Sequence, residues 1–247
     1  MQKTLKILAV FAALMVVAVI ILLPGRCERE KSMHSRIAPV AGQVKVRLPL
    51  PNPDSTTSIE KALRERRSVR DYRKAPLSLE ELAQLLWAAQ GITHGSGLRT
   101  APSAGALYPL ETYLVAGEVT DLPPGVYRYL PQRHELALLR SGDVRNQLRV
   151  ASLHQDAVSD APAAIVFGVV LARSTGKYGK RGIRYGHMEA GIAAQNVSLQ
   201  AVSLNLGTVV IGAFQDDDVR GVLSMPAAED PMIIMPVGRE RAAPSGK

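Results

Sequence analysis

Apolar residues recur at helical spacing in several segments after residue 58, and the sequence predicts a helix in each. The best-defined helix follows Ser78, which forms a capping box with Glu81, and its leucines share one face up to a stop at Gly91. Another helix is expected to begin after Ser58 as its N-cap. The remaining predicted helices span residues 141–153, 187–206 and 216–223.

Short apolar or alternating runs between these helices predict strands. They span residues 112–116, 126–130, 134–139, 163–171, 207–214 and 232–237. The run 163–171 is apolar throughout, so we expect it to be buried on both faces. Because helices interleave with strands and some strands form local hairpins, the predicted class is α+β with a mixed central sheet flanked by helices.

Small residues gather in the predicted helix 187–206. Ala190, Gly191, Ala193 and Ala194 would let another helix approach closely. The sequence leaves two interpretations open, namely packing inside one subunit and packing between two subunits.

The first 25 residues are predicted to anchor the protein in a membrane. Leu5 to Leu23 is an apolar run broken only by Lys6, and as a helix it would span roughly 28 Å, close to the hydrocarbon thickness of a bilayer. A cleaved signal peptide is the alternative. The short tail before the span favours a catalytic domain outside the cytoplasm. The other predicted parts are a proline-rich polar linker, a folded domain and a tail, over residues 26–58, 59–240 and 241–247.

Composition narrows the kinds of site that the chain can carry. Of its 247 residues, 47% are hydrophobic and 21% are charged, which fits a folded protein with a core. A single cysteine excludes a disulfide framework and a multi-cysteine metal site, and the five histidines lack metal-ligand spacing, so no metal is expected. Half of the net charge of +8 lies in residues 1–36, so the charge gives little reason to expect nucleic acid as a partner.

A dense group of basic residues lies between Lys61 and Lys74. This stretch holds seven basic and two acidic residues, a net charge of +5. Arg66, Ser68 and Arg70 alternate, so in an extended segment their side chains point to one side. Two guanidinium groups and a hydroxyl suit a phosphate group. A solvated helix face is the alternative interpretation.

Several motifs taken together resemble the nitroreductase superfamily of flavin enzymes. Residues 66–72, RRSVRDY, resemble its opening motif. Residues 101–111, APSAGALYPLE, resemble the signature of the SagB-type (ThcOx-like) dehydrogenase branch, which includes enzymes that oxidise azoline rings to azoles. Further matches follow in family order; they are Lys177-Tyr178, Arg184-Tyr185, Glu189 to Asn196, Gly207 to Gly212 and Pro236 to Arg239.

The resemblance implies an FMN-dependent oxidoreductase with a nitroreductase-like fold, built as an intertwined homodimer. Arg66, Ser68 and Arg70 would hold the phosphate and ribityl chain of FMN, and Gly238 and Arg239 would complete the phosphate site. The residues implied to lie along the flavin ring are Pro102, Ser103, Ala104, Gly105, Ile211 and Gly212. In this superfamily the loop that contains Pro102 often comes from the other subunit, so the site would need a dimer.

The resemblance also implies that Lys177 and Tyr178 are catalytic. In the azoline-oxidising branch the matching pair takes a proton from the substrate while hydride passes to flavin N5. The alternative is that residues 174–184, with three glycines, form a mobile loop without chemistry. The substrate would be a small molecule or a peptide. Two other functions stay open: an NAD(P)H-dependent reductase of electron-poor compounds such as nitro compounds, and a non-catalytic flavin-binding module.

Overall fold

A seven-stranded sheet lies at the centre of the computed structural model, which describes residues 44–241. Its strands stand in the order β1-β4-β3-β2-β5-β7-β6. Their bounds are Lys45–Arg47 (β1), Leu110–Ala116 (β2), Gly125–Leu130 (β3), Glu135–Ser141 (β4), Ala163–Val169 (β5), Gly207–Thr208 (β6) and Asp230–Gly238 (β7). The predicted anchor, residues 1–25, lies outside the described residues, and no helix within residues 44–241 is long and apolar enough to cross a membrane.

The sheet is antiparallel, so the prediction of a mixed sheet is wrong. Every pair of neighbouring named strands runs antiparallel. Among the described residues, parallel pairing occurs only at isolated bridges, such as that of Ser68 with Thr208. The reason is that β2, β3 and β4 form a meander, and the helical connection from β4 to β5 returns the chain at the same end of the sheet.

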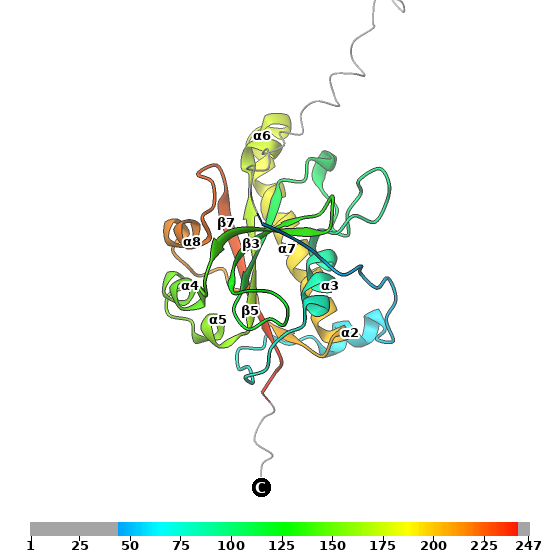
Figure 1. Ribbon diagram of the computed structural model, residues 1–247. Helices are drawn as coiled ribbons and strands as arrows, with labels where there is room; N and C mark the ends of the chain where they lie inside the picture. Colours follow the sequence, from blue (N-terminus) through cyan, green and yellow to red (C-terminus); the bar gives the residue numbers. More distant parts are fainter. Residues whose placement is uncertain (1–43, 242–247) are drawn as a thin grey trace, which may run out of the picture. The chain divides into compact units, whose positions relative to one another are not determined.

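Helices cover both faces of the sheet (Figure 1). The helices α2, α3 and α7 lie over one face, and α4, α5 and α8 lie over the other. Their bounds are Ile59–Glu65 (α2), Leu79–Gln90 (α3), Arg145–Ala151 (α4), Asp156–Asp160 (α5), Leu171–Tyr178 (α6), Arg181–Ser203 (α7) and Asp216–Leu223 (α8). Strand β5 contributes Ile165 to one core and Val166 to the other, which confirms that it is buried on both faces.

Local capping signals gave the correct helix starts. The Ser78 Oγ accepts a hydrogen bond from the Glu81 N–H at 3.2 Å, and the Glu81 carboxylate accepts one from the Ser78 N–H at 2.9 Å. Ser58 caps α2 in the predicted way. The bounds of α8 are those that the sequence predicts.

Two predicted elements are shorter in the structure. The helix expected over 141–153 begins only at Arg145, because Ser141 still pairs with Gly125 in the β3–β4 ladder. The strand expected over 207–214 is reduced to β6 and a bridge at Ile211, since the chain leaves β7 between these two contacts.

The helix expected over 187–206 begins earlier, at Arg181, and α6 precedes it directly. Residues 174–184 are therefore mostly helical, and their interpretation as a mobile loop is wrong. Gly182 explains the error, because a Cβ there would lie 2.5 Å from the Ser174 carbonyl carbon. This glycine permits close contact between the two helices and does not loosen the chain.

The folded domain starts earlier than residue 59. Strand β1 lies inside the range expected to be a linker and pairs with β4 along its three residues. Leu48 is buried beside it, and its N–H donates to the His134 carbonyl at 3.1 Å. A three-residue edge strand has too little apolar pattern to be recognised, so only its partner reveals it.

The small residues of α7 divide between the core and the surface. Ala190, Ala193 and Ala194 are buried within the subunit, in the core that α7 shares with α3. Gly191 is exposed. Packing inside one subunit therefore accounts for the three alanines, and only Gly191 is free to face a second chain.

Candidate functional site

The predicted phosphate-binding residues gather beside β6. Ser68 forms the bridge with Thr208, and the Val69 N–H donates to the Thr208 carbonyl at 3.0 Å. Because Val69 is buried, Ser68 and Arg70 on either side of it face the surface, and Arg66 is half-buried. The segment is thus extended with alternating faces, as predicted, and the helix-face interpretation is wrong.

Arg239 joins these residues from the end of β7. Gly238 pairs with Gly207 in the ladder between β7 and β6. The Arg239 Nη2 donates to the Glu81 carboxylate at 2.7 Å, so the side chain that caps α3 also orients Arg239. No local sequence pattern predicts this contact, because 158 positions separate the two residues. We refer to Arg66, Ser68, Arg70, Gly238 and Arg239 as the arginine cluster.

The arginine cluster fits a phosphate group. The Thr208 Oγ1, beside Ser68, is buried and has no hydrogen-bond partner among residues 44–241. Phosphate oxygens accept hydrogen bonds from a hydroxyl of this kind and from guanidinium groups. Arg67 does not join the cluster, because its Nη1 donates to the carbonyls of Arg64 and Arg66, each at 2.8 Å.

Gly238 has a role in packing. A Cβ at this position would lie 2.8 Å from the Pro162 Cδ and 2.9 Å from the Tyr72 Cδ1. The resemblance implied that Gly238 helps to complete the phosphate site. The structure places the neighbouring rings where a side chain at this position would be.

The loop around Gly105 forms a strained turn at the other end of the sheet. Gly105 has φ +62°, and Ala106 and Tyr108 follow at +55° and +46°. A left-handed backbone at a residue other than glycine costs roughly 1–2 kcal/mol. Surrounding contacts must therefore hold this turn in place.

Glu189 supplies one of those contacts. This residue of α7 is 5% exposed, and its Oε1 accepts a hydrogen bond from the Ala104 N–H at 2.9 Å. Within the turn, the Tyr108 N–H donates to the Ser103 Oγ at 2.8 Å. Burial raises the pKa of Glu189, while the Ala104 amide, the Ser103 hydroxyl and Arg99 oppose that rise.

Lys177 and Tyr178 face the same turn from the end of α6. A Cβ built on Gly105 would lie 2.6 Å from the Tyr178 Oη and 3.1 Å from the Lys177 Nζ. The ring of Tyr178 meets Tyr185 edge-on, with 5.1 Å between centroids, which restrains the phenol. An amine and a hydroxyl thus converge on one backbone turn, an arrangement that can hold and move a proton. We refer to Pro102, Ser103, Ala104, Gly105, Lys177 and Tyr178 as the loop cluster.

The two clusters lie towards opposite ends of α7, and Figure 1 shows α6 at one end of this helix. The loop cluster adjoins α6, which precedes this helix, and the arginine cluster adjoins β6, which follows it. With 23 residues, α7 is roughly 34 Å long. One chain therefore does not bring the two predicted parts of the site together.

Ile211 and Gly212 behave differently from each other. The Ile211 N–H and carbonyl both bond to Ile234 of β7, each at 2.9 Å. The Ile211 amide is thus committed to the sheet, and its N–H is not available to a ligand. Gly212 is exposed, and a Cβ there would meet nothing within 4 Å. Of the pair, only Gly212 leaves space for a ligand.

Comparison with known proteins identifies the family. The sequence pattern of the nitroreductase family matches residues 63–239. The chain belongs to the nitroreductase family. A nitroreductase-family protein of Methanocaldococcus jannaschii is 45% identical over 182 residues, which cover 74% of this chain and 91% of that protein.

Solved structures of nitroreductase-family type share the fold. A crystal structure from Ralstonia eutropha matches with a TM-score of 0.72 and 31% identity, over 81% of this chain and 90% of that chain. A chain of the Escherichia coli microcin synthetase McbBCD complex, with truncated pro-MccB17 bound, matches with a TM-score of 0.66 and 25% identity, over 89% of this chain and 84% of that chain. The predicted nitroreductase-like α+β fold is confirmed.

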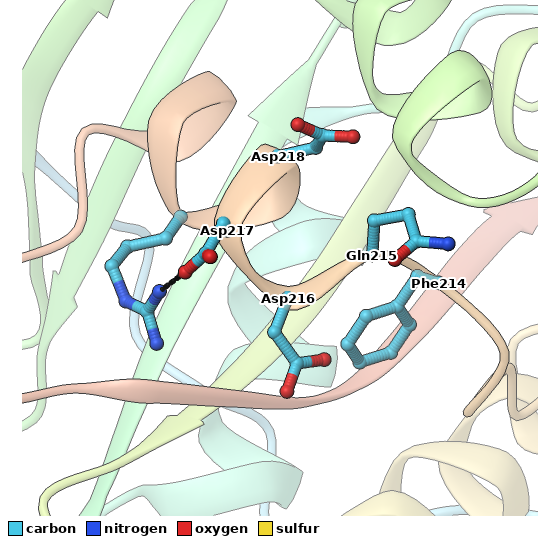
Figure 2. A pocket seen from close by; sticks show the side chains of 6 residues that line it. Phe214, Gln215, Asp216, Asp217 and Asp218 are labelled. Carbon is cyan, nitrogen blue, oxygen red and sulfur yellow. Dashed lines mark hydrogen bonds and ion pairs between the residues drawn. The ribbon is translucent and has the colours of Figure 1, made fainter.

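A solvent-open hollow of about 690 Å³ is lined by residues 214–218 and Arg220, just after Gly212 in the sequence of this nitroreductase-family chain. Figure 2 shows Phe214 and the three aspartates at the start of α8 that line it. Arg220 pairs with Asp217 there, which reduces the local negative charge. The hollow contains none of the predicted site residues, so we do not assign it a role.

Proposed function

We propose that this chain is an FMN-dependent oxidoreductase in which Lys177 and Tyr178 move a substrate proton. The observation that supports this most strongly is the convergence of the Lys177 Nζ and the Tyr178 Oη on the turn at Gly105. Bound FMN would supply two-electron redox chemistry at its ring. In the proposal, the arginine cluster binds the phosphate, and Gly212 leaves room for the ring.

The preferred direction of reaction is dehydrogenation of the SagB type. Lys177 takes a proton from a substrate carbon or nitrogen, and the Tyr178 hydroxyl orients the reacting group. The likeness to a chain of the microcin synthetase complex favours a peptide as substrate, since that complex contains a truncated pro-peptide. Azoline-to-azole oxidation is the specific reaction that we propose to test first.

The second candidate is an NAD(P)H-dependent reductase of electron-poor compounds. Its support is the higher identity to the protein of Methanocaldococcus jannaschii and to the structure from Ralstonia eutropha, both of the nitroreductase type. In this direction the same Lys177 and Tyr178 would deliver a proton to the product.

We further propose a homodimer whose FMN sites combine both chains. The distance along α7 between the two clusters is the reason. The exposed side of that helix carries Met188, Gly191 and Ile192, an apolar strip that a second copy would cover. The arginine cluster of one chain would then meet the loop cluster of the other.

One set of measurements on the purified protein tests the function. A yellow protein that binds FMN, and whose flavin an azoline peptide reduces in the wild type but not in Lys177→Ala, supports the dehydrogenase. Steady oxidation of NADPH by a nitroaromatic compound supports the reductase. Flavin that binds and is never reduced by any donor indicates a binding module. Failure to bind added FMN refutes the proposal as a whole.

We also propose that residues 1–25 anchor the domain to a membrane from outside the cytoplasm. The apolar run from Leu5 to Leu23 is the basis. A topology reporter that is active only outside the cytoplasm, fused after Lys247, should be active. An inactive reporter on an intact fusion protein would reverse the orientation.

A further inference from the structure

A line of charged side chains runs along one face of the sheet towards the loop cluster. Glu229 is fully buried and accepts hydrogen bonds from the Tyr113 hydroxyl and, at 2.7 Å, from the Arg128 Nη2. The same Arg128 nitrogen lies 2.8 Å from the Glu111 carboxylate. The Arg173 Nη2 then donates to the other Glu111 oxygen at 2.5 Å. Two cations alternate with two carboxylates, so the buried charges balance.

Arg173 connects this line to the strained turn. Its Nη1 donates to the Tyr108 carbonyl at 2.9 Å, while its Nη2 holds Glu111 three residues further along the chain. Tyr108 is one of the residues with positive φ. A single guanidinium thus fixes both the end of the turn and the start of β2, which a lysine with one point charge could not do equally well.

The position of Arg173 on α6 gives these contacts a consequence for the site. Lys177 follows four residues later, about one helical turn further along. The Lys177 side chain is exposed, so few contacts of its own restrict it. Where its amine can lie therefore depends on the position of α6. Fixing α6 against the turn is therefore what sets where the Lys177 amine can lie.

We propose that Arg173 is a positioning residue of the active site, which fastens α6 to the turn through Glu111 and the Tyr108 carbonyl so that Lys177 and Tyr178 face Gly105. This inference rests on the proposed function, since it assigns Lys177 and Tyr178 their reaction. It explains why a glutamate closes the signature of residues 101–111, because Glu111 is the anchor that receives Arg173.

Hydrogen exchange in the FMN-free protein tests the contact without any assay of activity. Arg173→Gln should speed exchange of the amides in residues 103–111 and 171–178 by about 10-fold or more, because a charge-assisted hydrogen bond is lost. The matched control is Arg149→Gln on α4, which loses a 2.6 Å contact with Asp156 near the start of β5, the end of that strand remote from the turn. It should leave both segments unchanged. Unchanged exchange in Arg173→Gln overturns the proposal.

Reaction rates test whether Arg173 acts through Lys177. Arg173→Gln should slow flavin reduction by about 10-fold and change the affinity for FMN less than about 2-fold, because Arg173 contacts none of the residues proposed to bind the phosphate. Combined with Lys177→Ala it should slow the reaction by less than its own roughly 10-fold, because much of its effect acts through Lys177. Effects that multiply overturn the proposal.

A second variant covers the case in which Arg173→Gln does not fold. Arg173→Lys keeps the charge next to Glu111 but cannot also reach the Tyr108 carbonyl. It should therefore give faster exchange and slower flavin reduction than the wild type, and wild-type values for both overturn the proposal. A wild-type protein that binds no FMN refutes the proposed function alone, and the exchange comparison then still decides whether Arg173 fixes α6.

Discussion

Mixed dimers test whether one FMN site is built from two chains. The loop cluster contacts Glu189 of α7 and the arginine cluster adjoins β6, which follows Ser203, so their separation along α7 is about 21 Å. Strand β7, whose nine residues run between the same two ends of the sheet, gives about 26 Å. Both lengths exceed the span from the phosphate of FMN to its ring. We therefore expect Lys177 of one chain to serve the FMN whose phosphate is bound by Arg66 and Arg70 of the other.

The perturbation places one defect in each chain. One chain carries Arg66→Ala with Arg70→Ala, the other carries Lys177→Ala, and two different affinity tags isolate the mixed dimer. In the crossed arrangement one site is intact and the second has both defects, so the mixed dimer should react at about half the wild-type rate. If each site used a single chain, both sites would be damaged. Loss of a proton-transfer group typically costs about 100-fold or more, so the two results are far apart.

The assay is reduction of bound flavin in the mixed dimer, together with its FMN content. The control combines Lys177→Ala with Tyr178→Phe, which both damage the loop cluster, so every site keeps a defect and no activity should return. A mixed dimer that binds FMN and reacts no faster than its parents refutes the crossed arrangement.

Three further predictions concern Gly105 in the turn, the buried Glu189 and the hydrophobic core. Gly105→Ala and Gly97→Ala should each lower the free energy of unfolding by roughly 1–2 kcal/mol, because both positions have positive φ. Only Gly105→Ala should abolish flavin reduction, because a Cβ at residue 105 would meet Tyr178, whereas a Cβ at residue 97 would meet no atom within 4 Å. Equal losses of activity in the two variants would contradict the role of the turn. Because burial raises the pKa of Glu189, the folded protein keeps this proton to higher pH than the unfolded chain. The free energy of unfolding should therefore fall as pH rises from about 4.3, the unfolded value, to the raised pKa of the folded protein. Denaturant unfolding at several pH values measures this fall, and Glu189→Gln should remove the part of it that Glu189 causes. The same pH dependence in the variant would exclude Glu189 as its source. Leu86→Ala should cost roughly 2–5 kcal/mol in urea unfolding, because Leu86 is fully buried, whereas Leu63→Ala on the exposed side of α2 should cost less than about 0.5 kcal/mol.

Features that depend on neighbours in the sequence could be predicted. The capping box of Ser78 and Glu81 involves residues three positions apart, and its hydrogen bonds are those that the pattern implies. The alternation of Arg66, Ser68 and Arg70 also follows from local geometry, because an extended backbone places every second side chain on one side. Their gathering beside Arg239 depended on the family resemblance, since the sequence alone does not say which strand is their neighbour.

Contacts between distant parts of the chain could not be predicted. Arg173 with Glu111 and Glu189 with Ala104 are separated by 62 and 85 positions. Both glutamates lie inside motifs that the family resemblance covers, yet the resemblance gave neither of them a role. A buried carboxylate is costly without partners, so its burial in the structure is what directs attention to it.

Three glycines show why the interpretation of residues 174–184 as a mobile loop is wrong. Gly176, Gly179 and Gly182 were the basis of the alternative interpretation, a mobile loop, but a glycine can equally permit a left-handed turn or a close contact. Gly179 has φ +55° and ends α6, and Gly182 lets α7 pack directly against it. Both roles rigidify the segment that carries Lys177, which is the opposite of the mobile interpretation. A proton-transfer residue needs such a fixed support, so the same glycines that suggested absence of chemistry are among the structural reasons to propose it.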